Sequence, residues 1–89
     1  MTKPVLFFAH LCPDTEPFVK ELQRLNVEYE SVSILESMAN LKRFLRLRDQ
    51  HSAFDSVKAN GYVGVPALVL ADEQVILDYQ QLAKIFAHN

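Results

Sequence analysis

The sequence predicts an α/β protein in which helices flank a four-stranded mixed sheet with the strand order 2-1-3-4. Two observations carry this prediction. Short apolar runs typical of strands alternate with segments of helical spacing through most of the chain. The chain then closes with two strands joined by a short polar turn, which favours an antiparallel hairpin, and with a last helix. Because the chain has only 89 residues, we expect one domain over residues 1–89.

The first third of the chain is expected to form a strand, a helix and a second strand. Residues 5–9 are a compact apolar run that suits a central strand, and residues 27–32 alternate with period two. Between them, Pro13 fits the first helical position, which places Cys12 at the N-cap. The apolar residues of this helix recur at helical spacing: Phe18, Leu22 and Leu25. A helical connection makes the two strands parallel.

Two helices are expected in the middle of the chain. One lies within residues 34–48, where Ser33 and Glu36 have the spacing of a capping box. The residues that continue there at helical intervals are Met38, Leu41, Leu45 and Arg48. The other helix is shorter, starting near Ser52 and ending at Asn60-Gly61, a typical C-terminal stop.

The last third of the chain is expected to supply the hairpin and the last helix. Residues 64–71 and 75–77 have the apolar character of strands and are joined by the polar residues 72–74. Asp78, with Gln81 three residues later, is expected to cap the helix. The apolar residues of this helix share one face: Leu82, Ile85 and Phe86.

Composition argues against several kinds of partner and cofactor. The net charge is only −2, so no broad electrostatic attraction to nucleic acid or to an acidic membrane is expected. No segment approaches the roughly 20 apolar residues needed to cross a bilayer. The single cysteine cannot form an internal disulfide, which favours a reducing compartment, the cytoplasm. No pair of Cys or His residues has zinc spacing, so no protein-only metal site is expected.

Two short motifs lie where a thiol site would need them. Cys12-Pro13-Asp14-Thr15 follows the first predicted strand, and Val65-Pro66 precedes the apolar run of the third. With the element order, they resemble the glutaredoxins, in which Cys-Pro-x-Cys, or Cys-x-x-Ser in the monothiol branch, lies beside a cis proline. The chain looks closest to uncharacterised glutaredoxin-related proteins with a Cys-Pro-Asp-Thr motif. The resemblance implies a thioredoxin-like fold and a cis bond between Val65 and Pro66.

Cys12 is the candidate nucleophile. A helix N-terminus stabilises a thiolate through its unpaired N–H groups and the helix dipole, although the charge of Asp14 opposes this effect. Thr15 lies where a dithiol enzyme keeps its second cysteine, and we expect its hydroxyl to be able to donate to the sulfur. Because Thr15 cannot form a disulfide, an external thiol must resolve any mixed disulfide on Cys12, and the resemblance implies glutathione. The alternative is a small apolar residue without reactivity.

Residues around the motifs leave further alternatives open. His10 could pair with the thiolate and activate it, or simply end the strand. With a cis bond, Pro66 would present the carbonyl and N–H of Val65 to a substrate peptide; otherwise it merely begins a strand. Tyr79 could line this groove or pack on the core. Four cations of the middle helix could attract a carboxylate or form a solvated face: Lys42, Arg43, Arg46 and Arg48.

The glutathione-binding pattern of the glutaredoxins is only partly present. The lysine that commonly precedes the cysteine is replaced by Ala9. The glycine-rich turn before the last helix here reads Leu77-Asp78-Tyr79-Gln80-Gln81, without glycine. What remains of the pattern is the backbone of Val65, which in the family pairs with the cysteinyl part of glutathione.

Two functions therefore stand side by side. The first is a monothiol thiol-disulfide oxidoreductase that acts through Cys12, with glutathione or oxidised protein thiols as partners and no tightly bound cofactor. The second is a non-catalytic thioredoxin-fold module that binds a peptide or a thiol. Iron–sulfur carriage is disfavoured, because Pro13-Asp14-Thr15 departs from the Cys-Gly-Phe-Ser motif of cluster-binding glutaredoxins and Asp14 would add charge beside an anionic cluster.

Overall fold

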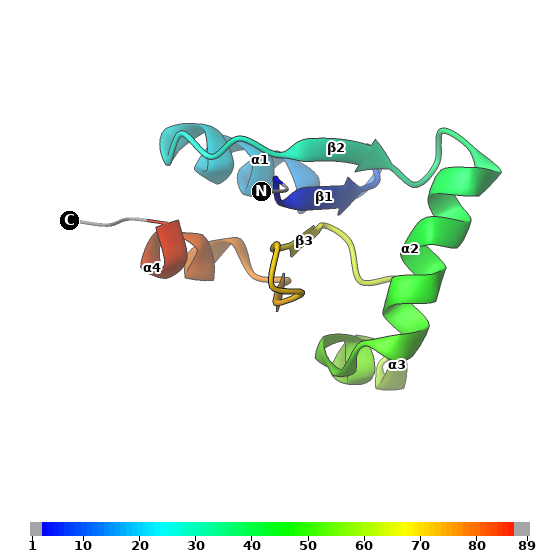
Figure 1. Ribbon diagram of the computed structural model, residues 1–89. Helices are drawn as coiled ribbons and strands as arrows, with labels where there is room; N and C mark the ends of the chain where they lie inside the picture. Colours follow the sequence, from blue (N-terminus) through cyan, green and yellow to red (C-terminus); the bar gives the residue numbers. More distant parts are fainter. Residues whose placement is uncertain (1–2, 87–89) are drawn as a thin grey trace.

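A computed structural model describes residues 3–86 and shows a four-stranded sheet with helices on both faces (Figure 1). The strands are β1 (Val5–Phe8), β2 (Glu30–Ser33), β3 (Ala67–Val69) and β4 (Val75–Ile76), in the order β2-β1-β3-β4. β1 pairs in parallel with β2 and antiparallel with β3, and β3 pairs antiparallel with β4. The predicted α/β class and strand order are therefore confirmed, and the fold is thioredoxin-like.

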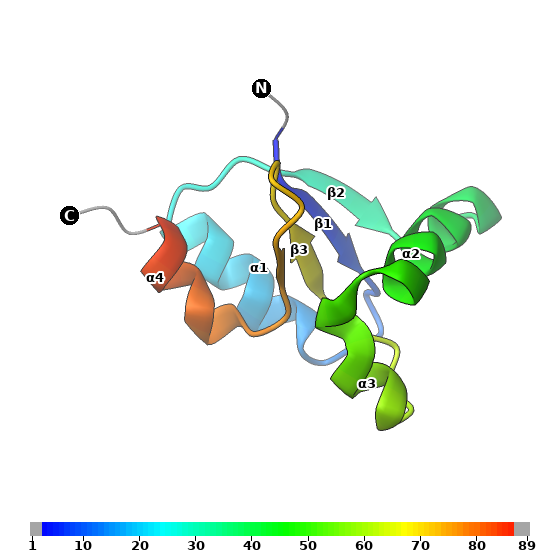
Figure 2. The same ribbon diagram turned by 60° about the horizontal axis from the view of Figure 1, so that its bottom comes forward.

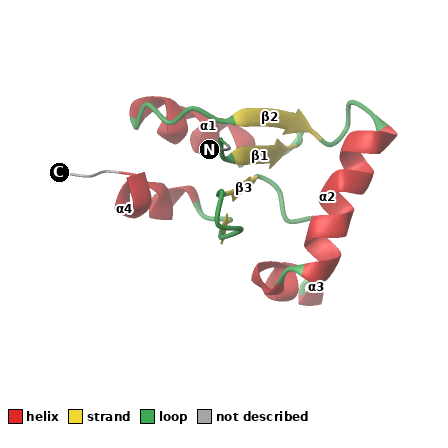
Figure 3. Ribbon diagram, in the orientation of Figure 1, coloured by secondary structure: helices red, strands yellow, loops and turns green. Residues whose placement is uncertain are grey.

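The helices divide between the two faces of the sheet, as Figure 2 shows. α1 (Thr15–Arg24) and α4 (Leu82–Phe86) lie on one face. α2 (Met38–Gln50) lies on the other face, where it is followed by the 3₁₀ helix η1 (Ser52–Phe54) and by α3 (Asp55–Ala59). A second 3₁₀ helix, η2 (Tyr79–Gln81), leads into α4. A long loop connects α3 to β3, as the colouring by secondary structure in Figure 3 shows. Within the described residues, none of the helices combines the length and the apolar character that a membrane span requires.

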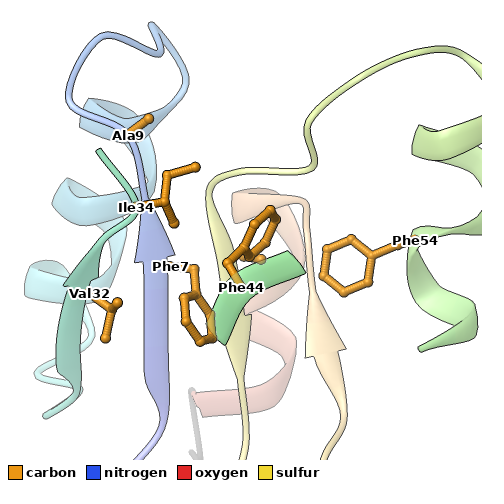
Figure 4. Close-up of a cluster of buried hydrophobic side chains, with 7 residues drawn as sticks. Phe7, Ala9, Val32, Ile34, Phe44 and Phe54 are labelled. Atoms are coloured by element: carbon orange, nitrogen blue, oxygen red, sulfur yellow. The ribbon is translucent and has the colours of Figure 1, made fainter. Parts of the chain in front are cut away.

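Alternation along β1 divides the core into two layers. Leu6 packs against α1 and α4, whereas Phe7 packs against α2 and η1, because successive side chains of a strand point to opposite faces. On the α2 side, the ring of Phe44 lies 5.6 Å from that of Phe7 and 5.8 Å from that of Phe54 (Figure 4). The buried residues of the layer on the α1 side are aliphatic apart from one phenylalanine: Leu6, Phe18, Leu22, Leu68, Ile76 and Leu82.

The first helix begins later than the sequence predicts. Its first residue is Thr15, and Asp14 rather than Cys12 occupies the N-cap position. Pro17 explains the difference. In a helix starting at Pro13, residue 17 would have to donate its backbone N–H to a carbonyl of the helix, but proline has no backbone N–H. With Thr15 first, Pro17 falls in the first turn, where N–H groups have no partner within the helix. The prediction of Cys12 at the N-cap was wrong.

The middle helix also begins and packs differently. The predicted capping box at Ser33 is wrong, because Ser33 still belongs to β2. The side chain of Ser37 caps α2 instead, accepting from the N–H of Asn40 at 3.1 Å. Phe44 is the fully buried residue of this helix, whereas Met38, on the predicted apolar face, is 66% exposed. Leu45 is exposed as well.

The loop and turn residues limit β3 to three residues, although eight were predicted. Gly64 has φ +97°, outside the extended region, and Pro66 has no N–H to offer a neighbouring strand. The short helix α3 ends at Ala59 with Asn60 as its C-cap, and Gly61 follows with φ +74°, so the predicted stop at Asn60-Gly61 is present. Asp78 caps η2 by accepting from the N–H of Gln80 at 2.9 Å, so the predicted cap is present one 3₁₀ turn before α4.

The corrected face of α2 yields a stability prediction. Replacing Phe44 by alanine removes a ring that two other aromatic residues contact, so we expect the free energy of unfolding to fall by about 3–5 kcal/mol. The matched change Met38→Ala, on the exposed side of the same helix, should alter it by less than about 0.5 kcal/mol. Urea denaturation followed by circular dichroism measures both, and equal effects would contradict the assigned face.

Candidate functional site

Cys12 lies in a turn between β1 and α1. Its N–H donates to the carbonyl of Ala9 at 2.9 Å, and its own carbonyl accepts from the N–H of Thr15 at 3.1 Å. Two consecutive turns, over residues 9–12 and 12–15, therefore carry the chain from the sheet into the helix. They hold the cysteine just outside the helix, with its side chain partly buried.

The thiol faces a segment 53 residues away in the chain. Cys12 Sγ lies 3.5 Å from the carbonyl oxygen of Val65, to which the S–H donates. Only the protonated thiol can make this hydrogen bond, since a thiolate has no hydrogen to donate. Loss of the thiol proton therefore breaks this contact.

Thr15 does not play the role that the sequence predicts for it. Its hydroxyl donates to the carbonyl of Ala9 at 2.8 Å, so its single hydrogen is not available to the sulfur of Cys12. The predicted bond from Thr15 to the sulfur is thus replaced by a bond that closes the turn. Thr15 positions the cysteine through the backbone.

The segment opposite the thiol is held by packing and by an arginine. The peptide bond between Val65 and Pro66 is cis. Gly64 lies so close to η1 that a Cβ atom would approach Phe54 Cδ1 to 2.9 Å. The side chain of Arg48 donates from Nε to the carbonyl of Val63 at 2.7 Å and from Nη2 to the carbonyl of Tyr62 at 2.6 Å. The loop before the proline is therefore tied to α2 and η1.

An open depression of about 440 Å³ lies beside the sulfur. Most of its lining is apolar, and among its described lining residues only Asp14 carries a charge. Two smaller depressions adjoin Val65 and Pro66, and the second of them is lined also by Asp78 and Tyr79. Tyr79 is 38% exposed, so it borders this groove instead of packing fully into the core.

The other predicted residues are only partly brought together. His10 is exposed, and within residues 3–86 the hydrogen bond of the Cys12 side chain goes to Val65 and not to this histidine. Arg43 forms an ion pair with Glu30 at 3.1 Å and lies over the ring of Phe7, so its contacts are with residues of β2 and β1. Lys42 and Arg46 are exposed. Across the part of the chain that the structure describes, no group of three or more His, Cys, Asp or Glu residues could hold a metal ion.

Sequence reasoning missed the apolar rim and its support. Leu35, Tyr62 and Val63 are exposed apolar residues that line the depression beside Cys12. A signal was present: two apolar residues stand between Gly61 and Gly64, in a segment too short and too glycine-rich for a helix or strand. The role of Arg48 had no such signal, because it depends on where the loop folds back.

The fold and the site define a thioredoxin-like protein with one cysteine in the turn after the first strand. The solved structures that it resembles include a mutant of a thioredoxin-like protein, with a TM-score of 0.67, 20% identity and coverage of 97% of this chain and 100% of that one. A glutaredoxin from Archaeoglobus fulgidus gives a TM-score of 0.66 at 19% identity, covering 100% of this chain and 89% of its own. A glutathione transferase homologue from Sulfitobacter, solved with bound glutathione, gives 0.56 at 18% identity, over 98% of this chain and 38% of its own.

A relative by sequence places the chain in a family. An uncharacterized protein from Haemophilus influenzae is 56% identical over 86 residues, which span 97% of this chain and 100% of that protein. No protein-family model matches the chain. The chain therefore belongs to the same family as this Haemophilus influenzae protein.

The two glycines of the loop before Val65 give a matched pair of variants. Both have positive φ, so alanine at either costs about 1–2 kcal/mol of backbone strain. A Cβ at Gly61 meets nothing within 4 Å, whereas one at Gly64 would press on Phe54. We expect Gly64→Ala to lower the free energy of unfolding by about 1–3 kcal/mol more than Gly61→Ala. Equal urea midpoints for the two variants would contradict the close approach to η1.

Proposed function

We propose that the chain is a monothiol thiol-disulfide oxidoreductase, a single domain over residues 1–89 that acts through Cys12. The observation that carries the proposal is the position of the partly buried Cys12 sulfur, which faces the backbone of Val65 next to Pro66. It places a partly exposed sulfur beside a backbone that can receive an extended chain. The likeness of the fold to glutaredoxin and thioredoxin-like structures supports the same class of chemistry.

The reaction needs two exchange steps because the chain has one cysteine. In the first, the Cys12 thiolate attacks one sulfur of a disulfide, a new sulfur–sulfur bond forms, and the other sulfur leaves as a thiolate. In the second, an external thiolate such as that of glutathione attacks the substrate sulfur of the mixed disulfide and releases Cys12 as a thiolate. The disulfide passes from one pair of thiols to another, with no net change in electrons.

The neighbours of the sulfur support exchange with an outside thiol. Thr15 occupies the position of a second cysteine and is engaged with Ala9, so no internal group can resolve the mixed disulfide. Such a cycle needs a supply of reduced thiol, which is why we assign the protein to the cytoplasm.

A non-catalytic binding module is the second candidate. Two observations favour it: the S–H of Cys12 is engaged with Val65, and the charge of Asp14 lies beside the sulfur on the depression. In this case Cys12→Ser folds normally and keeps its partner, because the hydroxyl retains a donor toward the carbonyl of Val65.

Comparing the folded and unfolded protein tests the proposed activity. The rate of mixed-disulfide formation with bis(2-hydroxyethyl) disulfide, an uncharged reagent, and with oxidised glutathione is followed by intact mass in buffer and in urea. We expect the folded protein to react at least about tenfold faster than the unfolded one with the uncharged reagent, because a site that activates a thiol should exceed a free cysteine. Cys12→Ser should form no adduct.

Turnover completes this test. With a second thiol present, the wild-type protein should exchange disulfide in many cycles, whereas Cys12→Ser should not rise above the uncatalysed rate. If the folded protein reacts more slowly than the unfolded chain, the sulfur is shielded instead of activated and the binding module is the better assignment. A urea denaturation curve of Cys12→Ser that matches the wild type serves as the control for folding.

A further inference from the structure

Exposed apolar side chains gather around the sulfur. Four large exposed apolar residues line the depressions next to Cys12: Leu11 (77% exposed), Leu35 (50%), Tyr62 (64%) and Val63 (53%). Three of them line the depression of about 440 Å³ that also contains the sulfur, and Leu11 lines the depression on the α1 side of it. Apolar surface that collects at one place, with a reactive group at its centre, marks a contact site for another molecule.

The loop that carries Tyr62 and Val63 is held in place by residues of α2 and η1. Arg48 binds the carbonyls of these two residues, so their backbone is fixed while their side chains remain exposed. Gly64, the next residue, is packed against Phe54. The backbone of the apolar rim is therefore part of the ordered fold, so this loop loses less conformational entropy when a partner binds.

The depressions that Val65 lines carry negative charges, whereas the depression on the α1 side of Cys12 carries charges of both signs. Among the described residues that line the depression beside Cys12 and the two adjoining Val65-Pro66, the charged ones are Asp14 and Asp78. On the α1 side, Lys20 lines the surface but lies 3.7 Å from Glu16, so that pair is neutral overall. Arg48 does not line these depressions, and its guanidinium is engaged by backbone carbonyls. A ligand with carboxylates therefore meets no lining cation in the three depressions around Val65, and on the α1 side it meets only Lys20, which is already paired with Glu16.

Glutathione fits these surroundings poorly. It carries two carboxylates and one ammonium group, and it offers little apolar surface for Leu35 and Tyr62 to cover. An extended protein segment fits better, because its backbone can pair with Val65, whose N–H enters none of the hydrogen bonds within residues 3–86. Apolar neighbours of the substrate cysteine would then cover the rim, and basic ones would complement Asp14.

We infer that the site of the proposed exchange selects a cysteine in an extended protein segment with apolar or basic neighbours, and that it discriminates against glutathione as the incoming disulfide. The inference rests on the proposed function, since it concerns the first exchange step. In that step the Cys12 thiolate forms the mixed disulfide with the protein segment, and the other sulfur of the substrate disulfide leaves as a thiolate. Glutathione then acts only as the external thiol of the second step.

The test compares symmetrical disulfides in the first step. The parent substrate is an acetylated and amidated pentapeptide whose central cysteine lies between valine and leucine, with lysine at one end. Two matched peptides replace the lysine by glutamate, or the valine and leucine by serine. Oxidised glutathione and bis(2-hydroxyethyl) disulfide complete the set. Each rate constant is divided by that of the same disulfide with free 2-mercaptoethanol, which removes differences in intrinsic reactivity.

The expected order follows from the charges and the rim. The parent peptide should react at least about tenfold faster than oxidised glutathione, since a few apolar contacts at the centre of an interface supply most of its binding energy. The change to glutamate should slow the reaction about two- to fivefold, as for an exposed charge pair. In the double variant Tyr62→Ser with Val63→Ser, the ratio of the parent to bis(2-hydroxyethyl) disulfide should fall about fivefold. Met38→Ser, an equally exposed apolar residue of α2 outside the depression, should leave that ratio unchanged.

Four outcomes would overturn the inference. Oxidised glutathione could match the parent peptide, or the ratio could stay the same in the double variant; in both cases the proposed exchange activity still stands. A second copy of the chain could cover the rim, which sedimentation would reveal as a dimer that the double variant dissociates. If no disulfide reacts faster with the folded than with the unfolded protein, the proposed function itself fails and the inference fails with it.

Discussion

The carbonyl oxygen of Ala9 is the point on which the candidate site depends. It accepts from the N–H of Cys12 and from the hydroxyl of Thr15, and so closes the turn that leads from β1 into α1. Ala9 directly follows the central strand, which has hydrogen-bonded neighbours on both sides. The sheet therefore determines where the sulfur lies, and the helix only receives the chain afterwards.

The second half of the site, the loop before Val65, is held on the α2 side of the sheet. Gly64 contacts Phe54, and Phe54 packs on Phe44 of α2. Arg48, from the same helix, binds the loop just before Val65. The encounter of the sulfur with Val65 thus depends on the α2-side layer of the core, since Ala9, Cys12 and Val65 all belong to or pack against it.

Sequence patterns predicted the sheet well because apolar runs and a polar turn determine it locally. They predicted the helix starts less well, because two local signals competed. Pro13 suits a first helical position, but Pro17 four residues later excludes a helix that begins there, and the second constraint prevails. The contacts of Thr15 and Arg48 were out of reach, since both depend on where separate segments meet. The meeting of Cys12 with Val65 was within reach, because the resemblance of their two motifs to those of the glutaredoxins implies it.

The anchoring of the loop by Arg48 bears on how such a site can change over time. The guanidinium of Arg48 donates to backbone carbonyls. Its hydrogen bonds to the loop therefore do not depend on which side chains stand at positions 62 and 63. Substitutions at these two places can alter the character of the surface without weakening the framework beneath it. The chemistry of this surface can therefore change through substitutions at these two positions while the anchored backbone stays as it is.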